Sequence, residues 1–291
     1  MNPRLFFLFF LIVIINKADA QIYYDDEYHD FTYELGGSLG AMNAFTDIGG
    51  RDGKGRMFIK DINLQTTQLS YGLFIGVMYK DIIGLRLEGT YGSVKAYDSL
   101  LPPNDQQERY LRNLSFSSKI IELSLVGEYH PIEMFTDRFP IISPYVVAGI
   151  GYYHFNPQAK LNGTYIDLQP LRTEGQGFAE YPGRKVYSLN QFNIPLGLGA
   201  KFYISPKINL KLEFQYRLLF TDYLDDASTT YIDPILFSKY LSGENLTHAL
   251  LLNDRSKPGA QTAHIDGIRA SSKYNDAYYT LSIKFGISLG R

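Results

Sequence analysis

The chain has 291 residues, a formal net charge of −2 and no cysteine or tryptophan, while phenylalanine and tyrosine bring its aromatic content to 15%. The absence of cysteine excludes a disulfide scaffold and thiol catalysis, and the balanced charge gives no electrostatic footprint for nucleic acid. A chain of this length can build one soluble core or one barrel with long loops.

The first twenty residues have the pattern of a secretory signal peptide. Arg4 supplies a basic start, residues 5–15 are uninterruptedly apolar, and Ala18-Asp19-Ala20 matches an A-x-A cleavage site. The apolar run is shorter than the about 17–25 residues that a membrane-spanning helix needs. We therefore expect residues 1–20 to be a signal peptide and residues 21–291 to form a single domain.

Eight segments then alternate apolar and polar residues with the period of two that indicates a β-strand. They are residues 28–45, 65–79, 84–95, 117–130, 144–155, 191–204, 208–220 and 277–289. Each exceeds the about 9–11 residues of a tilted transmembrane strand, and an even number is typical of bacterial single-chain barrels. The segment 144–155 is apolar on both faces, so its facing is the least certain.

The connections between these segments alternate in length. Short connections cover residues 80–83, 131–143 and 205–207, and long ones cover 46–64, 96–116, 156–190 and 221–276. Outer-membrane barrels have short periplasmic turns and longer extracellular loops. We predict an all-β fold, an eight-stranded antiparallel transmembrane β-barrel with long extracellular loops, in the outer membrane of a Gram-negative cell and surrounded by its lipid. Both termini are then periplasmic.

A soluble eight-stranded barrel is the alternative, and it would turn its apolar faces inward. The strand lengths and the alternating connections favour the membrane barrel. Its lumen would receive five acids and five bases: Glu34, Arg86, Glu88, Glu122, Glu128, Lys201, Lys211, Glu213, Arg217 and Lys284. Side chains fill a barrel of this size, and unpaired buried charges are costly. We expect a plug of ion pairs; the alternative is an ion or substrate channel.

Sequence motifs for chemistry are weak, and we predict no catalytic residue, cofactor or metal site. The five histidines show no HExxH spacing, and no G-x-S-x-G element is present. Asp222, Asp225 and Asp226 could offer oxygen ligands to Ca²⁺, but their spacing is not that of an EF-hand. We favour a loop whose Asp, Ser and Thr side chains cap their own backbone. Asp233-Pro234 then predicts the start of a short helix, with helical apolar spacing to residue 252.

The run Thr221-Asp222-Tyr223-Leu224-Asp225-Asp226, followed by Ser228-Thr229-Thr230-Tyr231, resembles the PorG-like outer-membrane barrels of Bacteroidetes. Residues 45–50 (FTDIGG) and 84–88 (GLRLE) are also similar to that group. The resemblance implies a non-enzymatic accessory or anchor component of the type IX protein secretion system. It further implies contact with periplasmic secretion-ring proteins, which would fall on residues 131–143 and the two short turns.

Two other functions remain open on sequence alone. One is a small passive or gated channel. The other is an outer-membrane lipid-modifying enzyme, which predicts a cluster of Ser, His and an acid near one rim of the barrel.

Overall fold

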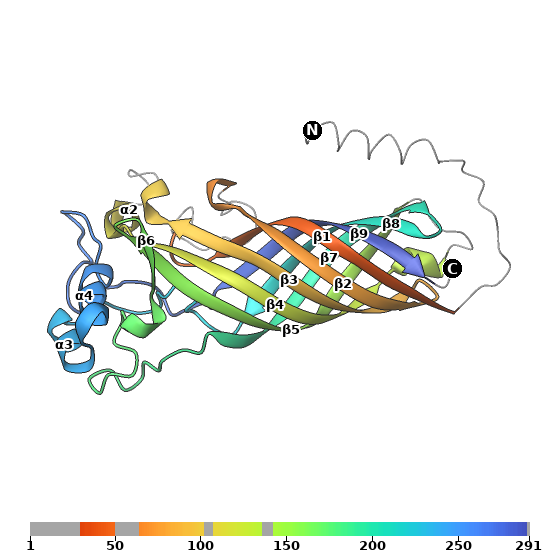
Figure 1. Ribbon diagram of the computed structural model, residues 1–291. Coiled ribbons are helices and arrows are strands. Elements are labelled where there is room, and N and C mark those ends of the chain that lie inside the picture. Colours follow the sequence, from red (N-terminus) through yellow and green to blue (C-terminus); the bar gives the residue numbers. More distant parts are fainter. Residues whose placement is uncertain (1–29, 50–63, 102–106, 136–141, 290–291) are drawn as a thin grey trace, which may run out of the picture.

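The computed structural model describes residues 30–49, 64–101, 107–135 and 142–289. Its wall strands are β1 (Phe31–Phe45), β2 (Gln68–Tyr79), β3 (Ile83–Tyr97), β4 (Ser115–Tyr129), β5 (Ile142–Leu161), β7 (Asn190–Ser205), β8 (Ile208–Leu219) and β9 (Ala277–Leu289). They form one elongated barrel (Figure 1). The expected signal peptide at 1–20 and the segment 21–27 after it lie outside the described residues.

Hydrogen bonds join each wall strand to its neighbour along the chain and then close the cylinder. β1 pairs antiparallel with β2 on one side and with β9 on the other. β5 pairs with β4 and with β7, which completes the ring of eight wall strands. Closure satisfies the backbone groups along the wall, as lipid surroundings require. The predicted eight-stranded antiparallel barrel is confirmed.

The apolar faces of the strands point outward. Leu73 of β2 is 75% exposed and Phe192 of β7 is 63% exposed, whereas the charged residues between such positions are buried. The uncertain strand also has a clear facing, because Val146 and Ile150 are exposed while Tyr145 is buried. A soluble barrel would bury these apolar side chains, so the arrangement suits a wall in contact with lipid.

The short connections gather at one end of the barrel, which we call the turn end, and the long ones at the other, the loop end (Figure 1). The turn end includes the short helix η3 (Pro131–Met134). The elements at the loop end are η1 (Leu64–Thr66), η2 (Asp98–Leu100), α2 (Gln107–Arg112), β6 (Thr164–Asp167), η4 (Gln169–Leu171), η5 (Pro234–Leu236), α3 (Phe237–Tyr240) and α4 (Gly243–Leu252). In the described part of the chain, no helix has the length and apolar character needed to cross a membrane.

Two local predictions need correction. The fifth strand was expected to end at residue 155, but β5 continues to Leu161 and returns as β6. Asn162 and Gly163, both with positive φ, make the tight Asn-Gly turn that joins them. The helical pattern of residues 235–252 is also split, because Ser242 is extended and Gly243 has a φ of 59°. Three short helical segments, η5, α3 and α4, therefore replace one.

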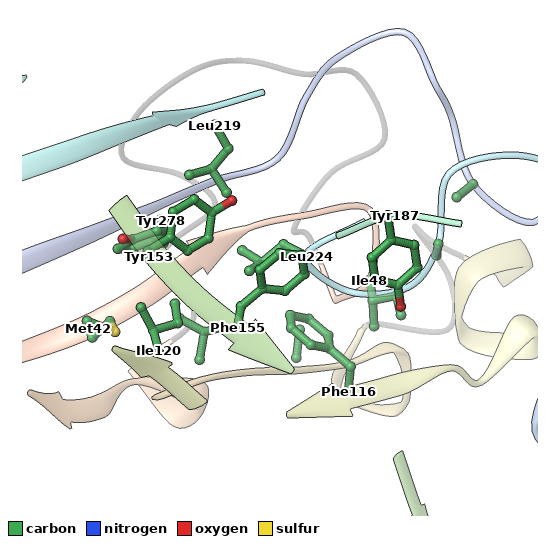
Figure 2. Packing of buried hydrophobic residues seen from close by; sticks show 14 of the residues in the cluster. Met42, Ile48, Phe116, Ile120, Tyr153, Phe155, Tyr187, Leu219, Leu224 and Tyr278 are labelled. Carbon is green, nitrogen blue, oxygen red and sulfur yellow. The ribbon is translucent and has the colours of Figure 1, made fainter. Parts of the chain in front are cut away.

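An apolar layer fills the loop end of the lumen. Inward side chains of six strands, among them Met42, Ile120 and Phe155, pack with Ile48, Leu224 and Tyr187 from the loops (Figure 2). Several are fully buried, including Leu224. The long loops thus fold back over the mouth and contribute to the same core as the wall.

Candidate functional site in the lumen and the loop cap

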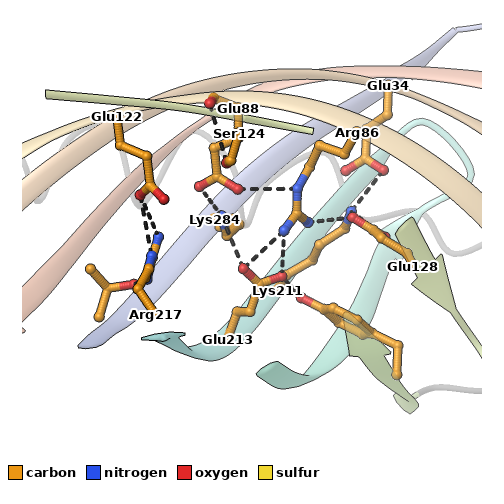
Figure 3. A network of polar contacts seen from close by, with 12 residues as sticks. Glu34, Arg86, Glu88, Glu122, Ser124, Glu128, Lys211, Glu213, Arg217 and Lys284 are labelled. Carbon is orange, nitrogen blue, oxygen red and sulfur yellow. Dashed lines mark hydrogen bonds and ion pairs between the residues drawn. The ribbon is translucent and has the colours of Figure 1, made fainter. Parts of the chain in front are cut away.

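A connected set of ion pairs fills the lumen on the turn-end side of the apolar layer (Figure 3). Arg86 of β3 lies at its centre. One guanidinium nitrogen donates to both carboxylate oxygens of Glu213, at 2.8 and 2.9 Å, and the others approach Glu88 at 3.2 Å and Glu128. Lys284 of β9 bridges Glu213, at 3.1 Å, and Glu88. Four strands are therefore joined through one guanidinium group and one ammonium group.

Two further groups complete this lumen network. Lys211 lies 3.0 Å from Glu34 and 3.3 Å from Glu128, and Lys201 lies 3.6 Å from Glu34. Arg217 forms a separate pair with Glu122 at 3.2 Å, and Asn193 donates to the same carboxylate. The structure thus brings together all ten residues that the sequence placed in the lumen, each of them buried.

The composition of the lumen network decides what it can do. Each acid has at least one cationic partner, so the desolvation cost of burying charge is offset by close pairing. Acids and bases alternate across the interior, and neither sign forms the ring of charge that selects ions in channels. The arrangement is suited to filling and cross-bracing the barrel.

The turn end of this network contains a serine, a histidine and an acid in contact. Ser143 Oγ lies 3.0 Å from His130 Nδ1, and His130 Nε2 lies 3.2 Å from Glu128 Oε2. His130 also stacks on Tyr145. This is the composition of a hydrolase triad. However, Ser143 and His130 are each 0% exposed, and Glu128 is shared with Arg86 and Lys211. A substrate carbonyl therefore has no approach to Ser143 in this conformation.

The Thr221–Asp226 motif lies at the loop end, where it joins separate long loops. We call these joined loops, which cover the mouth of the barrel, the loop cap. Asp225 accepts hydrogen bonds from the backbone N–H of Ile48 and of Ala227, both at 3.0 Å. Asp226 accepts from the hydroxyl groups of Thr173 and Tyr187, both at 2.6 Å. Both carboxylates are fully buried. The motif therefore connects the last long loop to the first and the third.

Two buried arginines hold these loops together and add the second long loop to them. Arg112 pairs with both oxygens of Asp98 and also donates to the backbone carbonyls of Asp47 and Arg269. Arg269 pairs with Glu174 at 2.9 Å and donates to the backbone carbonyl of Asp226. Glu174 in turn accepts from the backbone N–H groups of Ser228 and Thr229. Sequence reasoning missed these residues, because loops carry no periodic pattern that marks a buried charge.

Several carboxyl groups of the loop cap are displaced from their usual titration range. Burial raises the pKa of Asp225 to about 7 and that of Asp226 to about 6. Burial also raises the pKa of Asp222 to about 8. For Asp276, which accepts from the backbone N–H of Leu224, burial and the nearby carboxyls of Asp225 and Asp222 raise the pKa. These groups resist ionisation because burial penalises their charged form.

The sequence offers the same aspartates as oxygen ligands for Ca²⁺. Among the described residues, no three His, Asp or Glu side chains are grouped to hold a metal ion. Asp225 and Asp226 instead direct their oxygens at backbone amides and hydroxyl groups of the loops. Hydrogen-bonding of this kind is what Asp provides in ordered turns.

Comparison with known proteins identifies one family and several distant structural likenesses. The family model described as outer membrane protein beta-barrel domain matches residues 7–233. No curated protein matches the sequence. Among solved structures, the chain is similar to Neisserial surface protein A, with 11% identity over 90% of this chain and 98% of that chain, at a TM-score of 0.40.

Two other solved structures illustrate the same likeness. OprG from Pseudomonas aeruginosa is 10% identical, over 89% of this chain and 96% of that one, with a TM-score of 0.40. A major outer membrane protein from Thermus thermophilus is 12% identical, over 90% and 100%, with a TM-score of 0.41. Such distant likenesses assign no activity.

Proposed function

The chain belongs to the outer membrane protein beta-barrel domain family, and from that premise we propose that it is a closed, non-enzymatic barrel that serves as an accessory or anchor of the type IX protein secretion machinery. In this proposal the turn end and both termini face the periplasm. The loop cap then faces the cell exterior, as long loops do in such barrels.

The observation that carries this proposal is the closure of the lumen. The lumen network fills one part of the interior and the apolar layer fills the other. The loop cap adds buried hydrogen bonds over the mouth. A barrel closed in this way is suited to anchoring other proteins rather than to passing solutes. The link to secretion itself rests on the sequence resemblance of the Thr221–Asp226 motif.

The turn end offers a surface for a periplasmic partner. Phe135 is 84% exposed and Met134 is 53% exposed, beside the half-exposed Ile132. Tyr129 and Tyr203 hold the underlying turn, through hydrogen bonds to Met134 and Glu133. Exposed apolar side chains on a held turn are typical of a protein-binding patch. Residues 136–141, which belong to the same predicted contact region, lie outside the described residues.

Deletion of the gene tests the proposal. We expect loss of type IX cargo secretion, restored by the wild-type chain but not by a Met134→Ser/Phe135→Ser variant that has lost co-purification with periplasmic ring proteins. Lys207→Gln, at another exposed position of the turn end, is the matched control and should restore secretion. Normal secretion in the deletion strain would rule the proposal out.

The Ser143–His130–Glu128 contact favours one second candidate, a lipid acyl hydrolase whose triad opens during the reaction. That candidate predicts ester hydrolysis that Ser143→Ala abolishes. Equal ester hydrolysis by the wild type and by Ser143→Ala excludes the hydrolase candidate. The channel alternative predicts single-channel currents in planar bilayers, and a silent barrel excludes that function.

A further inference from the structure

A small pocket with two cations opens at the loop end, on the outer side of the barrel wall. It has a volume of about 330 Å³ and is lined by Tyr97, Ser99, Asn113, Ser115, Lys160 and Arg255, among others. We propose that this pocket binds an anionic saccharide, a sugar unit that carries a phosphate or carboxylate group. The inference goes beyond the proposed function and takes from it only the outward orientation of the loop end.

Within the described part of the chain, the cations of the pocket have no acidic partner. No carboxylate lines the pocket, and among the described residues none lies within ion-pair distance of Lys160 or Arg255. Arg255 instead donates to Ser115 Oγ at 3.0 Å. Two unneutralised cations at one pocket favour an anion.

The pocket is also held in shape by its neighbours. Asn113 donates to the backbone carbonyl of Arg255 at 3.1 Å, and the backbone N–H of Lys257 donates to the carbonyl of Leu111. These bonds fix the segment that carries Arg255 against the second long loop. The ordered segment and the bond to Ser115 hold the Arg255 guanidinium, which retains further N–H donors, so binding costs little entropy.

The other lining groups suit a sugar. Ser99 and Ser115 supply hydroxyl groups, Asn113 an amide, and Tyr97 an aromatic ring. Polar groups of this kind hydrogen-bond to the hydroxyls of a sugar. The volume lies at the small end of ligand pockets, about 300–1,000 Å³. One sugar unit with its charged group fits such a space better than a peptide or an acyl chain.

The position of the pocket indicates where the saccharide comes from. Tyr97 and Ser115 are paired across β3 and β4, and Lys160 continues the outward face of β5. Strands rise about 3.3 Å per residue and tilt by about 40°, so Tyr97 and Lys160 lie roughly 15–20 Å beyond the exposed rings of Tyr91 and Tyr152 on the same faces. The pocket therefore opens to the side of the barrel, above the membrane, where it faces the sugars of neighbouring outer-leaflet lipids.

Charge on the wall below the pocket agrees with this placement. Lys95 of β3 and Lys119 of β4 share the outward face between the aromatic rings and the pocket, and Lys119 is exposed. Asp167 of β6 is one exposed acid nearby, and it accepts hydrogen bonds from Asn156 and Gln158. The surface leading to the pocket is thus predominantly basic, which attracts anionic groups.

The test uses the full chain in detergent micelles, so that neither secretion nor orientation enters the measurement. The probe is the deacylated, phosphorylated core oligosaccharide of an enteric lipopolysaccharide, and its dephosphorylated form is the matched probe. Titration calorimetry should show saturable binding of the phosphorylated probe. Lys160→Gln/Arg255→Gln should weaken that binding by about tenfold or more, because two charge-assisted contacts are lost.

Two further variants separate binding from folding. Lys160→Gln alone changes an exposed side chain and should still weaken binding, even if the Arg255 change loosens the loops. Lys185→Gln, an exposed cation elsewhere on the loops, should leave binding unchanged. Intact lipopolysaccharide retained by the wild type but not by the double variant identifies a lipid-borne saccharide, and binding of the free oligosaccharide alone identifies a soluble one.

Three results would overturn the proposal. The first is no saturable binding of the oligosaccharide or of intact lipopolysaccharide. The second is an equal weakening of oligosaccharide binding by Lys185→Gln, which indicates general electrostatic attraction without a defined site. The third is competition by inorganic phosphate at the same affinity as the oligosaccharide, which indicates an anion site that does not recognise the sugar.

Discussion

Asp225 accepts a hydrogen bond from the backbone N–H of Ile48, at 3.0 Å, across 177 positions of sequence. The second oxygen of the same carboxylate accepts from Ala227 N–H. One buried side chain therefore satisfies backbone donors of the first and last long loops together. This hydrogen bond gives the Thr221–Asp226 motif a structural role in holding loops to each other.

Replacing this carboxylate should loosen the loop cap while the barrel stays closed. Asp225→Ala leaves two buried N–H donors unpaired, at about 1–3 kcal/mol each. We expect faster proteolysis of the loops with unchanged heat-modifiable mobility of the barrel. Asp233→Ala is the control, because Asp233 caps only Ile235 in an exposed turn. Equal protease sensitivity of the two variants would contradict the assigned role.

The pH dependence of the loop cap follows from the raised pKa values. Folded Asp222, Asp225 and Asp226 have pKa values of about 8, 7 and 6, above the usual value of 3.8. The folded cap therefore binds more protons than the unfolded loops. Its stabilisation is fully present below about pH 4 and is lost as the pH rises through 6–8.

Hydrogen exchange measures this change at single amides. The amides of Ile48, Leu224 and Ala227 should open more often at pH 8.5 than at pH 5.5, after correction for intrinsic exchange. Amides in the middle of β2 are the internal control, because no carboxyl group of the loop cap contacts them. Tighter loops at the higher pH would show that the carboxyl groups are ionised when folded.

The Arg217–Glu122 pair can be tested by a double-mutant cycle within the lumen. Arg217→Met alone should cost about 3–5 kcal/mol, because it leaves Glu122 buried without its cation. Arg217→Met/Glu122→Leu should cost less than the sum of the single changes, because no unpaired charge remains. Urea unfolding in lipid vesicles measures all three free energies. Additive losses would mean that the two side chains act independently.

Two glycines of the wall predict opposite outcomes for the same change. A Cβ at Gly149 would lie 2.1 Å from the carbonyl oxygen of Leu125, on the neighbouring strand, whereas nothing lies within 4 Å of a Cβ at Gly89. Gly149→Ala should therefore reduce the assembled fraction or cost about 1–3 kcal/mol through overpacking. Gly89→Ala should be neutral. The heat-modifiable fraction on gels compares them directly.

Much of the wall could be predicted from sequence because lipid imposes a strict alternation. Leu210, Leu212 and Phe214 alternate with Lys211 and Glu213, and the structure places the two sets on opposite faces. The sequence did not reveal the extension of β5 to Leu161, since beyond residue 155 the outward positions become polar and the inward ones apolar, which inverts the pattern of the lipid-facing wall. The Asn162-Gly163 pair was the local signal that could have located the hairpin.

The loop cap was much less predictable. Arg112, Glu174 and Arg269 are far apart in sequence and become neighbours only through the loops. Ser143 and His130 meet because the turn between β4 and β5 brings two inward positions together, and no spacing motif marks them. Contacts of this kind depend on strand register, which periodicity alone leaves open.

The bonds of the loop cap also act as a check on assembly. Ile48 follows β1 and Asp225 follows β8. Strand β9 lies between β1 and β8, and it pairs with each of them in a separate register. A slip of two residues in either pairing keeps every apolar side chain facing lipid, yet it displaces the partners by about 6.6 Å. Such a slip keeps the apolar outer face, but it prevents the Asp225–Ile48 bond and separates ion pairs of the lumen network such as Lys284–Glu213. A formed loop cap therefore marks the barrel with the correct strand register, which the apolar outer face alone does not distinguish from a barrel with a slipped register.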